Sequence, residues 1–429
     1  MLIKLIAASY IQSAIALLTG LVNIKYLSPA DIGHYSGTLL WKDFALHCNS
    51  GENESLRKLL PSTKNAEQQQ DFFDRAFTLA ILTVVSYSAI AILLHFFRHE
   101  SNKFDLTRVA VLLVFVIEYI QYSFQATLMG TNRFSLISRF VLVTSLFNLS
   151  TCIFVYSYGL HGFLVGRVLY AFSSLIIMML LVGIRPTKFV FQGYFEILKT
   201  GLPMQATVIC TLLNSNAGRI FLTLQGDNKN LGLLVFCLYF TVPFSQIVIN
   251  IAGLSFFKYS SVNNRSVMKS GLDVKGNWLF TTLLILLATS AVGLFIKLVF
   301  SEYSQIILPT QILILTTITA MMYSDRVSYI LANAGGVSLA IFNLVAAMMF
   351  FFVTLILTQS GIDPLLSISI SSLVSAHMLG IFVLFWLELR ESHQTKAVIR
   401  LVLKEWLKIV HPMLISGLIL FSGIKLFSF

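Results

Sequence analysis

The chain has 429 residues, of which 56% are hydrophobic and only 11% charged, and its mean hydropathy is +0.81. Soluble domains carry about 25% charged residues, so this composition excludes a protein whose whole surface faces water. The formal net charge of +11 reflects the loops of a membrane protein, and we predict no nucleic-acid partner.

Apolar runs of about 20 residues recur along the whole chain, which is the length of helix that crosses a hydrocarbon core about 30 Å thick. The polar gaps between them do not follow the alternating pattern of a membrane β-barrel, so we expect helices. The first run lacks a small-residue cleavage site and is expected to remain as a span. The predicted spans are 3–24, 32–56, 74–97, 107–128, 139–158, 163–184, 200–224, 231–257, 278–300, 306–328, 338–358 and 364–388, and a shorter run at 413–427 leaves twelve or thirteen spans open.

The lysines and arginines of the loops predict the orientation of the chain. With the amino terminus in the cytoplasm, 17 of these residues lie in inside segments and six in outside segments. This asymmetry places the segments near Lys58 and Lys199 inside and those near Lys25 and Lys229 outside.

Two short matches between the halves of the chain indicate an internal repeat. Residues 158–164 resemble 360–366 at an offset of 202, and the turn at 128–136 aligns with 331–339 at an offset of 203. An even number of spans in each repeat makes the two repeats parallel. We therefore predict an all-α polytopic membrane protein with two six-helix lobes in pseudo-two-fold parallel repeat, at 1–186 and 187–390. An amphipathic segment and an extra, short hydrophobic helix would follow at 391–429.

Polar residues within the predicted spans are the candidates for a functional site, because an ionised group at the bilayer centre costs about 2.5–3.5 kcal/mol. They recur on one helix face in the first, fourth, seventh and tenth spans, which predicts a hydrated cavity. Residues predicted to line this cavity are Gln12, Asn23, Gln125, Asn214, Ser215 and Asn216.

Charged residues in the spans are assigned two roles. The cations would compensate an anionic substrate, and the carboxylates would carry a coupling proton, since a low dielectric favours the neutral acid. Two structural explanations stay open: the adjacent pairs Lys42-Asp43 and Asp325-Arg326 could be ion pairs that only fix packing, and Arg167 could reach the interface. The predicted cations are Arg219, Arg326, Arg167 and Lys42, and the predicted carboxylates are Glu118, Asp43 and Asp325.

Several motifs of enzymes are missing from the sequence. It contains no GxxxxGK[ST] phosphate loop, no HExxH and no GxSxG. The four cysteines lie far apart without a CxxC pair, so no metal site or cofactor is predicted. The predicted outside loops are short, whereas a membrane polysaccharide polymerase would need a sizeable loop to hold its acceptor. We therefore predict a transporter rather than an enzyme.

Three stretches carry a resemblance to a known family. The sequence LSPADIGHY at 27–35 resembles the end of the first helix in bacterial polysaccharide flippases, and LKTGLP at 198–203 is similar to the start of their second half. NAGRIFL at 216–222 is similar to a third stretch of that family, in which an acidic residue usually stands where this chain has Gly218. These motifs resemble those of the O-antigen and exopolysaccharide flippases of the MATE-like exporter superfamily.

The resemblance implies a flippase of the bacterial inner membrane that serves polysaccharide or lipopolysaccharide synthesis. It would move an undecaprenyl-pyrophosphate-linked oligosaccharide across the bilayer by alternating access, with ion coupling. Implied partners are this substrate, membrane lipid, and the polymerase and chain-length proteins of the same pathway. A proton- or sodium-coupled small-molecule exporter of the same fold and a membrane polysaccharide polymerase stay open as alternatives.

Overall fold

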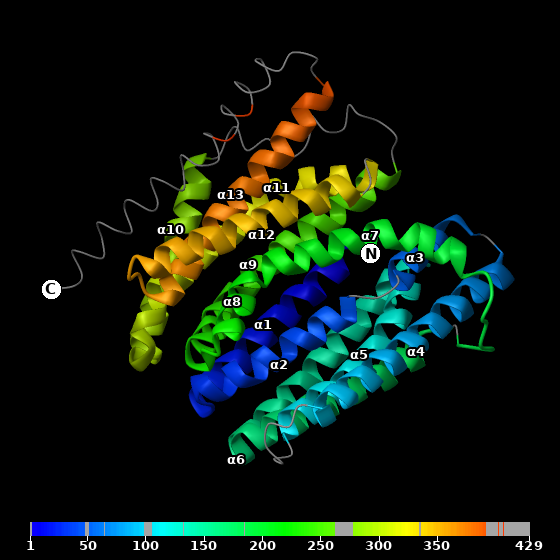
Figure 1. The fold of residues 1–429 in the computed structure, drawn as a ribbon, viewed down its shortest axis with the longest axis horizontal. Helices are drawn as coiled ribbons and strands as arrows, with labels where there is room; N and C mark the ends of the chain where they lie inside the picture. Colours follow the sequence, from blue (N-terminus) through cyan, green and yellow to red (C-terminus); the bar gives the residue numbers. More distant parts are fainter. Residues whose placement is uncertain are drawn as a thin grey trace. The chain divides into compact units, whose positions relative to one another are not determined.

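A computed structural model describes residues 2–47, 51–63, 65–97, 105–131, 133–183, 185–261, 278–333 and 336–391, together with 402 and 406. Over these ranges every regular element is a helix (Figure 1). Seven helices among them are long and apolar enough to cross a membrane. The prediction of an all-α, multi-pass membrane protein is confirmed. The predicted span at 413–427 lies outside the described residues, and so does most of the segment 391–429.

The described helices form two series, one in each half of the chain. The first half contains α1 (Leu2–Tyr26), α2 (Pro29–His47), α3 (Glu52–Leu59), the 3-10 turn η1 (Leu60–Ser62), α4 (Ala66–Phe97), α5 (Leu106–Gly130) and α6 (Phe134–Leu181). The second half contains α7 (Tyr194–Ser215), α8 (Ala217–Gln225), α9 (Asn228–Ser261), α10 (Trp278–Val299), η4 (Ser301–Ile306), α11 (Ile307–Asn333), α12 (Gly336–Gln359) and α13 (Pro364–Glu391).

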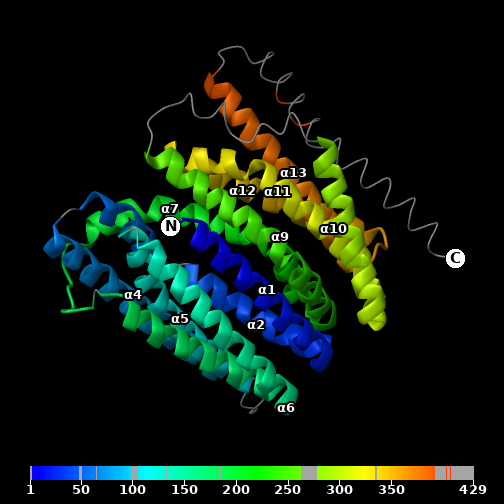
Figure 2. The same cartoon turned by 180° about the vertical axis from the view of Figure 1, so that it is seen from behind.

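The chain divides into two compact units. The first unit comprises Met1–Leu212 and Leu222–Gly232, and the second comprises Leu213–Phe221 and Leu233–Phe429. In the first unit α5 packs beside α4 and α6, and in the second unit α13 packs beside α11 and α12 (Figures 1 and 2). The lobe boundary predicted at 186/187 stays a prediction.

Helix α6 is two antiparallel helices rather than one long rod. Gly159 has φ 56° and ψ −132°, which interrupts the helix and which glycine adopts without steric cost. A Cβ at Gly162 would lie 2.5 Å from the carbonyl carbon of Phe154, and one at Gly166 would lie 3.2 Å from Cβ of Thr151. In a straight helix these pairs would be more than about 12 Å apart at 1.5 Å per residue. The chain therefore reverses at Gly159, as the separate predicted spans 139–158 and 163–184 required.

Two predicted spans are broken in the structure. The span at 32–56 is divided into α2, which ends at His47, and the short helix α3, which begins after Gly51 in the left-handed conformation (φ 79°). The first four residues of α3 are buried although they are polar, so hydropathy alone could not separate this helix from a loop. The span at 200–224 is interrupted at Asn216, between α7 and α8.

Each unit has its own hydrophobic clusters. In the first unit, aromatic side chains of α4 and α5 pack with aliphatic side chains of α3, α6 and α7. In the second unit, buried side chains of α11 pack against α13. Val402 and Trp406 join one of these clusters, beside Tyr323 and Leu384, so this part of the predicted amphipathic segment packs on protein. The members of the cluster in the first unit include Leu56, Leu60, Phe73, Phe77, Phe124, Ile137, Phe140, Met178 and Ile197.

Candidate functional site

A cluster of charged side chains lies inside the first unit. The ammonium group of Lys42 on α2 is 2.5 Å from Oε2 of Glu118 on α5 and 3.2 Å from Oδ1 of Asp43. The Lys42 side chain is only 7% exposed, whereas those of Glu118 and Asp43 are 22% and 23% exposed. A buried ammonium needs such partners, because an isolated charge in a low dielectric is costly. The predicted pair Lys42-Asp43 is thus present, and Glu118 completes it.

Arg167 on α6 belongs to the same cluster. It interacts electrostatically with Glu118 and with Tyr35 of α2, and its guanidinium carbon lies 5.5 Å from the ring centroid of Tyr170. Two cations and two carboxylates therefore meet among α2, α5 and α6, and their formal charges cancel. The cluster would attract an anionic ligand only after one of its carboxylates is protonated or displaced, because its net charge would then be positive.

Helix α5 also binds α3 through two tyrosines. The hydroxyl of Tyr119 donates to Oε1 of the fully buried Glu52 at 2.5 Å. The guanidinium of Arg57 donates to the hydroxyl of Tyr122 at 2.8 Å and to Oε1 of Glu54 at 3.0 Å. Sequence analysis missed these residues of α3. Residues 52–56 were assigned to the end of the predicted span 32–56, and no periodicity marks eight residues as a buried helix.

A second polar cluster, without charged members, lies in the second unit. The hydroxyl of Ser375 on α13 is within 2.8 Å of Oδ1 of Asn214 and 2.9 Å of the carbonyl oxygen of Ala346. Asn214 also donates to Oδ1 of Asn343 on α12 at 3.4 Å. Asn214 was predicted from the sequence as a polar side chain within a span. Its partners on α12 and α13 were not, because single serines and asparagines in apolar helices carry no spacing signal.

Arg219 lies at the start of α8. Its guanidinium donates to Oδ1 of Asn216 at 2.8 Å, in the break between α7 and α8. A Cβ at the neighbouring Gly218 would lie 2.6 Å from Cγ2 of Ile368 and 3.3 Å from Cδ2 of Leu234. An acidic side chain would not fit at this position without a shift of its neighbours, which gives a physical reason for Gly218.

The other predicted site residues are distributed over several helices. Asn23 on α1 is buried, whereas Gln12 on α1 and Gln125 on α5 are half-buried. Ser215 is exposed at the end of α7, and Arg326 is half-buried on α11. The side chain of Asp325 lies outside the described residues. Their roles as cavity lining, substrate-binding or ion-coupling residues stay predictions.

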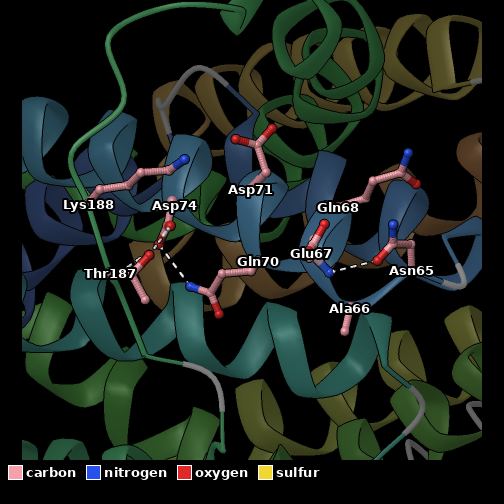
Figure 3. A pocket seen from close by; sticks show the side chains of 9 residues that line it. All are labelled: Asn65, Ala66, Glu67, Gln68, Gln70, Asp71, Asp74, Thr187 and Lys188. Carbon is pink, nitrogen blue, oxygen red and sulfur yellow. Dashed lines mark hydrogen bonds between the residues drawn. The ribbon is translucent and has the colours of Figure 1, made fainter.

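A polar pocket of about 810 Å³ lies where the segment between the halves passes the start of α4 (Figure 3). The fully buried Asp74 holds that segment: Oδ1 accepts from the backbone N–H of Thr187 at 3.0 Å, and Oδ2 accepts from its hydroxyl at 2.6 Å. Thr78 accepts from the N–H of Val190 at 3.0 Å. Residues 185–193, called the linker below, are thus bound to α4. The pocket is lined by Asn65, Ala66, Glu67, Gln68, Gln70, Asp71, Asp74, Thr187 and Lys188.

None of these sites has the composition of a metal centre. Among the residues that the structure describes, no group of three or more His, Cys, Asp or Glu side chains could hold a metal ion.

No family model matches the chain, and no curated protein matches it. Solved structures of two kinds of transport protein share its fold. The lipid II flippase MurJ in an inward closed conformation is 16% identical, with a TM-score of 0.63, over 99% of this chain and 98% of its own.

Two solved structures, each described as a multidrug resistance MATE family transporter of the MOP superfamily, are also similar. The inward-facing conformation is 14% identical with a TM-score of 0.61, over 93% of this chain and 99% of its own. The outward-facing conformation is 15% identical with a TM-score of 0.59, over 93% of this chain and 96% of its own. At these identities the comparisons show the fold, which is that of the MATE transporters and of MurJ.

Proposed function

We propose that this protein is a flippase that moves an undecaprenyl-pyrophosphate-linked oligosaccharide repeat unit across the bacterial inner membrane by alternating access. The observation that carries the proposal is the buried cluster of Lys42, Asp43, Glu118 and Arg167 on α2, α5 and α6. A neutral substrate would not require buried ionised groups, each of which is costly in a low dielectric, whereas a diphosphate would. The shared fold with a lipid II flippase over nearly the whole chain supports a lipid-linked substrate.

The balance of charge in the cluster suggests how an ion could be coupled to the substrate. Lys42 is compensated by Glu118 and Asp43, so it does not attract a phosphate in this state. A proton on Glu118 would leave the cluster with a net charge of +1, with Lys42 still paired with Asp43, and this excess positive charge would attract the anionic headgroup. Release of that proton would restore the ion pair and expel the phosphate. Protonation of Glu118 and binding of the anionic substrate would therefore favour each other.

Substitution of the two cations tests the proposal in proteoliposomes. The substrate is a fluorescent undecaprenyl-pyrophosphate disaccharide, and its movement is followed by a membrane-impermeant quencher. We expect Lys42→Ala and Arg167→Ala to slow movement by about tenfold or more, the loss of one charged hydrogen bond. The control is Arg139→Ala, since Arg139 on α6 is exposed and should change the rate by less than about twofold. Wild-type rates in both cation variants would contradict the proposal.

A charge exchange separates a substrate contact from a packing role. The double variant Lys42→Glu with Glu118→Lys keeps opposite charges within reach of each other. If the pair only fixes α2 against α5, the double variant should recover both protein level and translocation. If Lys42 meets the substrate phosphate, protein level should recover and translocation should not. Recovery of both would refute the binding role of Lys42.

The alternative function is a proton- or sodium-coupled exporter of small molecules, which the similarity to a multidrug MATE transporter favours. Efflux of cationic dyes from the same proteoliposomes distinguishes the two. Dye efflux without movement of the lipid-linked sugar would favour the exporter. Neighbouring genes for sugar-nucleotide synthesis and glycosyltransferases would favour the flippase.

A further inference from the structure

Helix α2 packs against the start of α9 through main-chain atoms, at glycines that have no side chain. A Cβ at Gly33 would lie 2.7 Å from the carbonyl carbon of Asn228, and one at Gly232 would lie 2.5 Å from that of Pro29. Residues 29 and 33 share a face of α2, as 228 and 232 share a face of α9, because four residues make about one turn. The two helices thus touch reciprocally, with each glycine against a carbonyl of the other. We call this the outer contact, because both segments are predicted to lie outside.

The opposite end of α2 has a second contact of the same kind. A Cβ at Gly51, between α2 and α3, would lie 2.7 Å from the carbonyl oxygen of Gly201 on α7, and one at Gly201 would lie 2.6 Å from the carbonyl carbon of Gly51. One turn further along α7, Gln205 donates from its side chain to the carbonyl oxygen of His47. Both segments are predicted to lie inside. We call this the inner contact.

Both contacts involve glycines that the sequence analysis had singled out for another reason. Gly33 belongs to the stretch 27–35 and Gly201 to the stretch 198–203, on which the family resemblance rests. Both are helical glycines, and neither has a positive φ, so backbone conformation does not require them. The close approach of the neighbouring backbone requires them. The second glycine of α2, Gly37, differs from them: a Cβ there would meet its nearest atoms at an ordinary 3.5 Å, among them Oγ1 of Thr223.

We infer that these two glycine contacts are the two closing points of the transport cycle, released one at a time. Alternating access requires a barrier on each side of the substrate path, and the inference rests on the proposed function for that requirement. Contacts made by backbone atoms suit such a barrier because they interlock closely yet bury few side chains that would have to be repacked when they part. In this structure both contacts are closed.

Alanine substitutions test the inference, because a methyl group prevents one contact and leaves the other. In a background with all four cysteines replaced by serine, Thr223→Cys reports on the outer contact and Thr207→Cys on the inner one. We expect Gly232→Ala to raise labelling at position 223 by an impermeant maleimide about tenfold or more, and Gly201→Ala to do so at 207. Neither should raise labelling at the other position. Gly37→Ala is the matched control and should change neither.

Two results would overturn the inference. Equal labelling of both reporters in both variants would mean that the glycines are ordinary packing residues, and the inference would be wrong. Unchanged translocation in Gly232→Ala and Gly201→Ala would also overturn it. The labelling does not depend on the substrate. If the labelling follows the expected pattern but the protein does not move the lipid-linked sugar, the proposed substrate is refuted and the inference about the two contacts holds.

Crosslinking covers the case in which an alanine variant fails to fold. Gly37→Cys with Thr223→Cys places two thiols within disulfide range across the outer contact. His47→Cys with Gln205→Cys places two thiols across the inner contact, where a short bis-maleimide can join them. Each crosslink should reduce translocation to the rate of protein-free vesicles, and a reductant should restore it for the outer pair. Translocation that continues when either crosslink is complete would overturn the inference.

Discussion

Removal of the Asp74 carboxylate should detach the linker from α4. Asp74 is fully buried and accepts two hydrogen bonds from Thr187 and one, at 3.0 Å, from the side chain of Gln70. A hydrogen bond to a charged group contributes about 1.5–3 kcal/mol. Because the adjacent pocket is open to water, the released groups of Thr187 would be hydrated, so we take the lower end for both bonds. The expected loss of about 3 kcal/mol raises the detached population of the linker roughly 100-fold.

Limited proteolysis of the purified protein in detergent measures this population. Trypsin cleaves after Lys188 in the linker but not after Arg185, because Pro186 follows it, and cleavage follows the detached fraction when reattachment is fast. Asp74→Ala should therefore speed cleavage there about 100-fold. Asp71→Ala is the matched control. Asp71 lines the same pocket but pairs with Arg75 at a half-exposed position, and such pairs contribute about 0–1 kcal/mol. Equal cleavage of both variants, or no change in Asp74→Ala, would refute the reasoning.

Three further substitutions test the fold and the site. Gly159→Ala forces a side chain into a left-handed conformation and should cost about 1–3 kcal/mol, seen as a lower melting temperature in detergent. Gly218→Asp should lower membrane-inserted protein, because its side chain would meet Ile368; normal levels would show that α8 can shift. Tyr119→Phe removes the hydroxyl bound to Glu52 and should destabilise the protein by about 1–3 kcal/mol, whereas an unchanged melting temperature would mean that water replaces the hydroxyl.

The sequence was most informative where hydropathy changes sharply. The reversal of α6 was predicted because Gly159 and the polar residues beside it separate two long apolar runs. The break between α2 and α3 was not, because a buried polar helix such as 52–59 resembles a loop to any hydropathy argument. Its burial depends on Tyr119 and Tyr122, which come from a helix about 65 residues further along the chain.

The sequence singled out individual charged residues but not their partners. Lys42 and Glu118 were singled out separately because each is an ionisable residue within an apolar run. Nothing in a single sequence indicates that residues 76 positions apart form an ion pair. The same holds for Gly33 and Gly201. Their motifs suggested a family, whereas their contacts with Gly232 and Gly51 depend on helix packing that only coordinates reveal.

The reversal at Gly159 bears on how the protein enters the membrane. The two arms of α6 meet with a single non-helical residue between them, so no polar loop has to be carried across the bilayer at that point. Their close approach at Gly162 and Gly166 already pairs the arms before any other helix is needed. The two arms can therefore partition into lipid together as a helical hairpin during synthesis. Such a hairpin would offer a preformed surface against which α1, made earlier and packed on α6 in the folded protein, can assemble.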